Sequence, residues 1–292
     1  MPELYPLYRP TQPRDAGRAA ASYLEAPPSP PLSPYIVCFW GMEQRPGSGS
    51  GTGHRVVPDG CMDMLFEWLP DGRIVRSSLC GAFGTPFDAL SSCRRVRYFG
   101  IRFFPGGLYR LLRIPAAEFT DRLLPLEDIS GTASSELAER LSRCRSFEEQ
   151  TAIAERHLLN MAGSLQPLDC DPSFGNALYE LLRSGGSMPV SELSARGGIS
   201  ERQLHRLFVK WTGLGPKPFG RIVRFQTILA SVSRGSDDSD WADTAAAFGY
   251  ADQAHFIRDF KSLYGQPPTE AVRAMRGHVR NVQYDRGGNR IY

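Results

Sequence analysis

The chain contains 292 residues, of which 41% are hydrophobic and 22% are charged, and its net charge is +3. The composition is ordinary for a globular protein, and the length is sufficient for two domains that each have a core. No apolar run approaches the roughly 20 residues that span a bilayer, and the N-terminal segment lacks the apolar stretch of a signal peptide. The expected compartment is therefore the cytoplasm.

The charge distribution and the cysteines exclude few classes of function. Residues 171–292 carry 16 Lys and Arg against 12 Asp and Glu, a net of +4, whereas residues 1–170 carry 18 against 19, a net of −1. A basic C-terminal part is compatible with nucleic-acid binding without requiring it. The cysteines form no C-x-x-C pair, so we interpret them as core side chains of a reduced protein, with a zinc site or a redox switch as the alternative. They are Cys38, Cys61, Cys80, Cys93, Cys144 and Cys170.

The first 104 residues change from a proline-rich lead-in to a series of strands. The lead-in, to about Pro34, is expected to be irregular with polyproline character. Two Pro-Asp-Gly turns, ending at Gly60 and Gly72, separate runs rich in aromatic and β-branched residues. Short strands joined by such turns favour an antiparallel barrel or sandwich. The predicted strands lie at 35–43, 55–57, 61–68, 73–83 and 94–104.

From residue 107 the apolar spacing changes to the 3.6-residue period of helices. In the last helix before the linker, Ser146 is the predicted N-cap and Glu149 its capping-box partner. That helix could form a dimer surface or pack only within its own domain. A polar linker around 166–172 divides the chain into a β-rich domain at 1–165 and a helical domain at 172–280. The predicted helices lie at 107–112, 116–124, 134–144 and 146–162.

The C-terminal domain contains one pattern twice. The copies, Ser200–Trp211 and Asp252–Leu263, lie 52 residues apart, and the same offset superposes a later glycine and proline in each. Such a repeat indicates a duplicated supersecondary unit. Each copy follows a short helix and a glycine turn, which is the form of a helix-turn-helix recognition element. A longer helix at 218–233 is the predicted spacer.

Each copy is predicted to bury one side and present polar side chains on the other. Ser200 and Asp252 are the predicted N-caps, which satisfy the free N–H groups at the helix starts. Arg can pair with guanine and Gln with adenine, so the outward side chains suit the base edges of a major groove. The predicted buried stripes are Leu204, Leu207, Phe208 and Trp211 in the first copy and Phe256, Asp259, Phe260 and Leu263 in the second, with Asp259 at the edge.

The stretch from Leu178 to Arg276 resembles the AraC/XylS family of bacterial transcription regulators. The resemblance rests on SELSARGGISERQLHRLFVKWTGLGPKPFGRIVRFQ and FGYADQAHFIRDFKSLYGQPP. It implies two helix-turn-helix units joined by a helix, with double-stranded DNA at promoter sites and RNA polymerase as partners and no cofactor. The DNA-contacting positions carry over to Arg202, His205, Arg206, Gln253, Ala254, His255 and Arg258.

The N-terminal part is similar to a cupin-like, sensor-type domain of the same family, on SPYIVCFW, VVPDGCMDMLFEW and YFGIRFFPGGLYRLL. This likeness implies an α+β two-domain protein that binds an unknown small-molecule effector, forms a homodimer, or both. Arg102 is the polar candidate for holding an anionic effector, and the alternative is an ordinary surface or turn arginine. The aromatic candidates for an effector pocket, each with core packing as the alternative, are Trp40, Phe66, Phe83 and Phe104.

Three rival functions need different residues. A metal-dependent cupin-type enzyme needs clustered histidines with a carboxylate, but residues 1–170 hold only His54 and His157. A methyl-accepting repair protein fused to a DNA-binding domain needs a zinc-activated cysteine cluster, and these cysteines are scattered. A constitutive DNA-binding protein with a dimerising N-terminal domain stays open. Asp59, Asp63 and Glu67 are assigned to a turn and to the solvent-facing side of a strand, so the predicted protein is a non-enzymatic regulator without metal.

Overall fold

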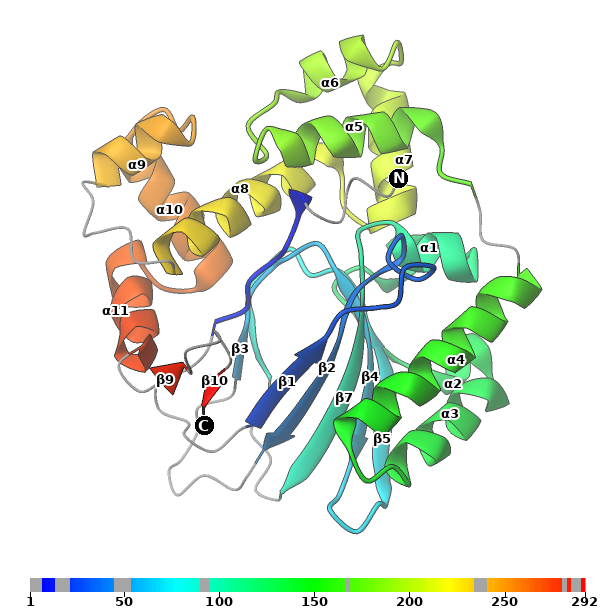
Figure 1. Ribbon diagram of the computed structural model, residues 1–292. Helices are drawn as coiled ribbons and strands as arrows, with labels where there is room; N and C mark the ends of the chain where they lie inside the picture. The colour runs from blue at the N-terminus through cyan, green and yellow to red at the C-terminus, as the bar shows by residue number, and fades with distance from the viewer. Residues whose placement is uncertain are drawn as a thin grey trace.

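A computed structural model describes residues 7–13, 22–44, 54–89, 95–165, 169–233, 241–279, 283–284 and 290–291. Over these residues a sheet with flanking helices is followed by a mainly helical part that arches above it (Figure 1). The strands are β1 (Ser22–Ala26), β2 (Ile36–Gln44), β3 (His54–Val56), β4 (Met62–Trp68), β5 (Ile74–Cys80), β6 (Phe87–Ala89), β7 (Val96–Phe103), β8 (Leu123–Pro125), β9 (Gln283–Tyr284) and β10 (Arg290–Ile291).

Within the described residues, six strands form one antiparallel sheet in the order β1-β2-β7-β4-β5-β8. The pair β3–β6 lies apart from it. The predicted antiparallel domain is confirmed, and its main sheet is open, because β1 and β8 stand at opposite ends of the strand order. The predicted strands of this region match β2, β3, β4, β5 and β7 to within a few residues.

Two expectations about the flanks of the sheet are wrong. The lead-in is not wholly irregular, because β1 pairs along its full length with β2. The segment 116–124 is not one helix: a short 3-10 helix, η2 (Ala116–Phe119), ends before Asp121, whose φ of 54° lies in the left-handed region. The chain then forms β8, where Leu124 pairs with Leu79 of β5. Backbone pairing with a strand already present outweighs the local helical pattern.

The helices are α1 (Gly107–Leu112), α2 (Glu127–Ser130), α3 (Thr132–Ser142), α4 (Phe147–Leu165), α5 (Pro172–Arg183), α6 (Val190–Arg196), α7 (Glu201–Thr212), α8 (Pro216–Ser233), α9 (Trp241–Ala247), α10 (Gln253–Tyr264) and α11 (Pro268–Val279). Ser146 accepts a hydrogen bond from the backbone N–H of Glu149 at 3.3 Å, which confirms the predicted cap of α4. The Glu149 carboxylate turns back to the backbone N–H of Arg145, one residue before the expected partner.

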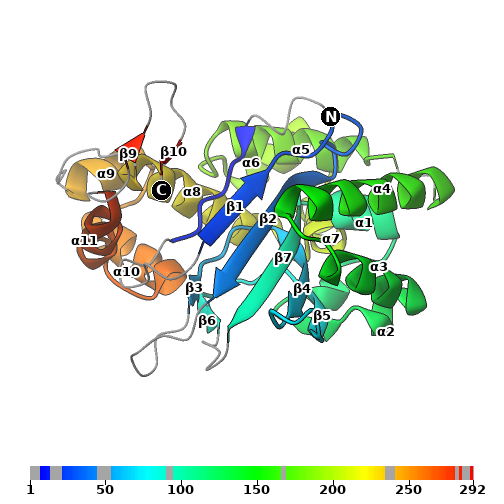
Figure 2. The same cartoon turned by 60° about the horizontal axis from the view of Figure 1, so that its bottom comes forward.

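The two faces of the main sheet differ because side chains alternate along each strand. One face is aromatic and packs under α3 and α4, where Phe147 contacts Phe99 with ring centroids 6.0 Å apart. Figure 2 shows these helices beside β7, β4 and β5. Phe66 pairs with Phe99 and belongs to this covered face. The opposite face carries Trp40 and Arg102, and polar groups gather there.

The helical part consists of two three-helix groups at the two ends of α8 (Figure 1). The first group is α5, α6 and α7, and the second is α9, α10 and α11. Asp171 caps α5 by accepting hydrogen bonds from two backbone N–H groups of its first turn. No helix among the described residues has the length and apolarity to cross a membrane.

Candidate nucleic-acid interface

The first copy of the repeat forms α7. Ser200 lies at its N-cap and accepts a hydrogen bond from the backbone N–H of Gln203 at 3.2 Å, as predicted. The apolar stripe packs inward: Leu204, Phe208 and Trp211 are buried and Leu207 is half-buried. Because this stripe fixes the rotation of the helix, its other side faces outward. The predicted readers Arg202, His205 and Arg206 are all exposed there.

The second copy forms α10 in the same way. Asp252 caps it by accepting a hydrogen bond from the backbone N–H of His255 at 2.6 Å, which confirms the second cap. The stripe of Phe256, Phe260 and Leu263 is buried. The predicted readers Gln253, Ala254, His255 and Arg258 are all exposed.

The two recognition helices also end alike. Gly213 and Gly265 have φ of 79° and 91°, a conformation that glycine adopts without the strain a Cβ atom brings. Each donates its backbone N–H to the carbonyl four residues earlier, Val209 and Lys261 respectively. Proline then begins the following helix in both copies. The two copies of the repeat therefore share the same three-dimensional structure from the N-cap to the C-cap of the recognition helix.

Helix α8 packs against both recognition helices, and it contacts the equivalent residue of each. Phe219 of α8 meets Phe208 of α7 edge-on, with ring centroids 5.8 Å apart. Phe225 of α8 meets Phe260 of α10 at 5.3 Å. Phe208 and Phe260 are the superposed positions of the repeat, so the spacer contacts the same point of each unit. It starts at Pro216, two residues before the predicted start.

The N-terminal domain contacts the C-terminal end of each recognition helix. Thr120 donates from Oγ1 to the carbonyl oxygen of Gly213 at 2.8 Å, just after α7. Arg55 of β3 donates from Nη1 to the carbonyl oxygen of Tyr264, the last residue of α10, at 3.3 Å. Cations near a helix C-terminus are favoured by the helix dipole. Both recognition helices are thus held from the same domain.

Aromatic packing strengthens the contact at α7. The indole of Trp211 lies 4.8 Å from the Tyr109 ring of α1 and 4.9 Å from the Phe174 ring of α5. Lys210 places its ammonium over Tyr109 at 5.3 Å. A small crevice remains here between the domains, and Cys170 is part of its lining. The first unit is therefore docked on the N-terminal domain by its buried face, away from its readers.

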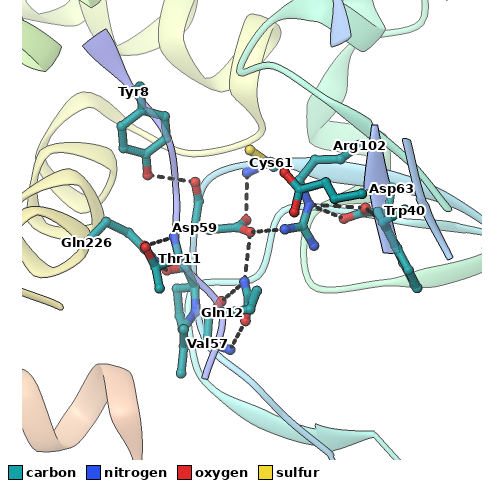
Figure 3. Close-up of polar contacts among 12 residues, drawn as sticks. Tyr8, Thr11, Gln12, Trp40, Val57, Asp59, Cys61, Asp63, Arg102 and Gln226 are labelled. Atoms are coloured by element: carbon teal, nitrogen blue, oxygen red, sulfur yellow. Dashed lines mark hydrogen bonds and ion pairs between the residues drawn. The ribbon is translucent and has the colours of Figure 1, made fainter. Parts of the chain in front are cut away.

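A polar network occupies the sheet face opposite α3 and α4. Figure 3 shows its polar contacts. Arg102 of β7 lies with Nε 3.2 Å from Asp63 Oδ1 and Nη1 3.6 Å from Asp59 Oδ2. Trp40 donates from Nε1 to Asp63 Oδ1 at 2.7 Å. Burial raises the pKa of Asp63, and Arg102 offsets this only in part. The Arg102 guanidinium thus forms ion pairs with two carboxylates, Asp59 and Asp63, in a largely buried cluster.

The network continues from Asp59 toward helix α8. Tyr8 donates its hydroxyl to the Asp59 carbonyl oxygen at 2.7 Å, and Gln12 donates from Nε2 to Asp59 Oδ2 at 2.8 Å. Gln226 of α8 accepts from the backbone N–H of Thr11 at 2.7 Å and donates to the Pro58 carbonyl oxygen at 2.8 Å. Figure 3 shows this chain of contacts from Arg102 to α8. Sequence reasoning missed it because its members come from distant segments.

The structure brings together only two of the five candidate effector-binding residues. Trp40 and Arg102 both contact Asp63, and Trp40 lies flat against Gly100, where a Cβ atom would clash with the indole. Phe66 lies on the covered face, 1% exposed, and Phe104 is 5% exposed. Phe83 is half-buried against Phe87, with ring centroids 4.5 Å apart. The role of all five in binding an effector stays a prediction.

The assignment of three carboxylates to a turn and a wet strand face is wrong for the strand. Asp59 does lie in the turn, and its Oδ1 accepts from the backbone N–H of Cys61 at 2.9 Å, yet it is buried. Asp63 is 14% exposed at the side chain, and Glu67 is buried with Oε1 2.7 Å from Arg76 Nη2. Ion pairing allows these charges to be enclosed.

The part of the chain that the structure describes contains no candidate metal-binding site. No three side chains of His, Cys, Asp or Glu gather there in a way that could hold a metal ion. The described cysteines are free thiols, and Cys93 lies outside the described residues. Burial raises the pKa of Cys80 to about 12 and that of Cys170 to about 11, so both are protonated near neutrality. They behave as packing groups.

Two family models match separate parts of the chain. Residues 193–274 match a family model described as a helix-turn-helix domain, and residues 24–125 match a domain of unknown function, DUF6597. No curated protein sequence matches the chain significantly. One similar solved structure is ToxT from Vibrio cholerae O395, with 12% identity, 78% of this chain and 95% of that chain covered, and a TM-score of 0.40. ToxT bound to (E)-4-(8-methylnaphthalen-1-yl)but-3-enoic acid has 10% identity, 88% and 99% coverage, and a TM-score of 0.40.

The matched helix-turn-helix model covers both capped recognition helices and the spacer between them. Together with the N-terminal sheet domain, it defines the class of protein as a DNA-binding transcription regulator. The helix-turn-helix domain is of the AraC type, and the resemblance predicted from the sequence is confirmed.

Proposed function

We propose that this regulator binds asymmetric promoter sites by placing α7 and α10 in successive major-groove segments of one double-stranded DNA. The supporting observation is that two helices with exposed polar faces are capped alike and held by equivalent contacts to one spacer helix. Successive major-groove segments lie roughly 34 Å apart on one side of B-DNA. The units offer different chemistry, Arg202, His205 and Arg206 against Gln253, His255 and Arg258. The two halves of the site therefore differ in sequence.

Selection of bound DNA from a random pool, followed by single substitutions, tests this proposal. Arg206→Ala and Arg258→Ala should each lose about 1–3 kcal/mol of binding free energy and relax specificity in one half of the site only. Arg143→Ala removes one positive charge from an exposed side chain of the other domain and should leave the selected site unchanged. Uniform weakening on every sequence would reassign an arginine to phosphate contact.

We further propose that the N-terminal domain makes this binding responsive to a small-molecule effector. The domain contacts the ends of both recognition helices and the middle of α8. The contacts that begin at Arg102 and Asp59 end at Gln226 of α8, so a change on the polar sheet face would act on the spacer helix that holds both recognition helices. An anionic effector at Arg102 would compete with Asp63 and Asp59, and release of Asp59 would alter the hydrogen bonds leading to Gln226.

Effector response is tested by repeating the DNA selection with candidate metabolites present. An effector that binds beside Trp40 should change tryptophan fluorescence, and Trp40→Phe should abolish that change. Trp241→Phe in the second helix-turn-helix unit is the matched control and should preserve it. If no metabolite alters either fluorescence or DNA affinity, the chain acts constitutively. We also propose a homodimer and contact with RNA polymerase, as the family resemblance implies, and a cytoplasmic location, as expected from the sequence.

A further inference from the structure

The spacer helix holds the second recognition helix by an ion pair in addition to the Phe225 contact. Arg221 of α8 donates from Nε to Asp259 Oδ1 and from Nη2 to Ser262 Oγ, both on α10. Tyr250 donates its hydroxyl to the other carboxylate oxygen of Asp259 at 2.9 Å. The Asp259 side chain is 12% exposed, so both of its oxygens are committed within the domain. As predicted, it lies at the edge of the apolar stripe.

A second arginine, one turn further along α8, ties this ion pair to both units. The Arg224 guanidinium lies over the Tyr250 ring, 5.1 Å from its centroid. Its Nη2 donates to the carbonyl oxygen of Gly186, in the turn between α5 and α6, at 3.1 Å. The Tyr250 ring also meets the ring of the predicted reader His255 edge-on, with centroids 5.3 Å apart. The cluster therefore runs from the first unit, through α8, to the reading face of α10.

The first unit lacks this arrangement. With the 52-residue offset, Asp259 superposes on Leu207 and Tyr250 superposes on Gly198. Helix α7 is oriented by apolar contacts and by docking on the N-terminal domain instead. Apolar contacts are non-directional, whereas charge-assisted hydrogen bonds fix distances and angles. A partly buried ion pair often adds little net stability, so a geometric role accounts better for its presence.

We propose that Asp259 is a positioning residue for the second DNA-reading helix. Through Arg221 and Tyr250 it fixes the rotation of α10 about its own axis relative to α8, and so presents His255 and Arg258 in a set phase relative to the first unit. This inference rests on the proposed function, in which both helices read DNA. It assigns specificity for the second half of the site to a residue that does not touch a base.

The test measures binding to three DNAs: the full selected site, one with the second half scrambled, and one with the first half scrambled. Asp259→Leu, which installs the residue type found in the first copy, should lower affinity for the full site and for the site retaining only the second half by about tenfold. Affinity for the site retaining only the first half should not change. Arg221→Met should have the same effect, and the double variant should lose no more than either single variant, because both remove one contact.

Several outcomes would overturn the inference. Equal weakening on all three DNAs means a general loss of structure, and additive losses in the double variant mean that the two residues act independently. Unchanged affinity for the full site also refutes it. Asp259→Asn provides a near-isosteric variant if Asp259→Leu fails to fold, and thermal unfolding checks each protein. Arg183→Gln, in an exposed ion pair with Glu180 on α5, is the matched control and should behave as wild type. Failure of the proposed function is distinct, because wild type would then select no two-part site.

Discussion

Gln226 and Pro58 join the spacer helix to the N-terminal domain. The Gln226 amide donates from Nε2 to the Pro58 carbonyl oxygen at 2.8 Å, although 168 residues separate them in the chain. The same amide accepts from the backbone N–H of Thr11 at 2.7 Å, and the residue is 2% exposed. One buried side chain near the middle of α8 therefore satisfies backbone groups of two distant segments.

Replacement of Gln226 by Leu should destabilise the protein by about 1–3 kcal/mol, because it removes the partner of a part-buried donor and of a buried acceptor. Chemical denaturation measures the free energy of unfolding. Gln203→Leu, at an exposed position of α7, is the control for stability and should change it by less than about 0.5 kcal/mol. Equal effects of the two substitutions would show that the Gln226 contacts do not contribute.

The two helix-ending glycines should respond differently to alanine. Both have positive φ, so each alanine carries a strain of about 1–2 kcal/mol. At Gly213 the new Cβ would clash with Thr120 Oγ1 and lie 3.1 Å from the Ala116 carbonyl oxygen, which is backbone of the other domain. At Gly265 it would meet Arg55 Nη1 at 2.6 Å, the end of a flexible side chain. Gly213→Ala should therefore lower the free energy of unfolding more than Gly265→Ala, and the reverse order would contradict this account.

Removal of the helix caps should cost about 1 kcal/mol each. In Ser200→Ala and Asp252→Ala a first-turn N–H loses its acceptor. The Asp252 loss should be the larger at low salt and should shrink as salt is added, because its charge also interacts with the helix dipole. Urea denaturation at two salt concentrations measures both effects. Ser164→Ala, at an exposed position of α4, is the control. A salt-independent difference between the two caps would rule out the dipole contribution.

Stability should fall on mild acidification through His157. Burial lowers the pKa of His157, and Arg140 lowers it further. The unfolded chain, with an imidazole pKa near the ordinary value of about 6.5, then binds more protons than the folded chain between the two pKa values. The contribution is thus fully present above the unfolded value and is lost as pH falls through that window. His157→Gln should flatten this part of the profile of unfolding free energy against pH. An unchanged slope would show that another group is responsible.

Much of the C-terminal domain could be predicted from the sequence because its signals are local. Ser200 and Asp252 occupy the predicted caps, Gly213 and Gly265 end the helices, and the apolar stripes fall at helical spacing. Hydrogen bonds within one turn produce the caps and the helix ends, and the helical period produces the stripes, so a short stretch of residues contains the necessary information. Five strands of the N-terminal domain, β2, β3, β4, β5 and β7, followed in the same way from aromatic and β-branched runs between turn residues, whereas β1, β6 and β8 did not.

Only the tertiary structure decided which distant groups meet. The pairing of β1 with β2, the enclosure of Asp63 beside Arg102, and the hold of Arg221 on Asp259 all depend on segments brought together by packing. Arg102 alone suggested an anion site, whereas the pairing of β4 with β7 is what places Asp63 directly opposite it. Residue type and period determine which face of an element is buried, but the partner across that face is set by the whole fold.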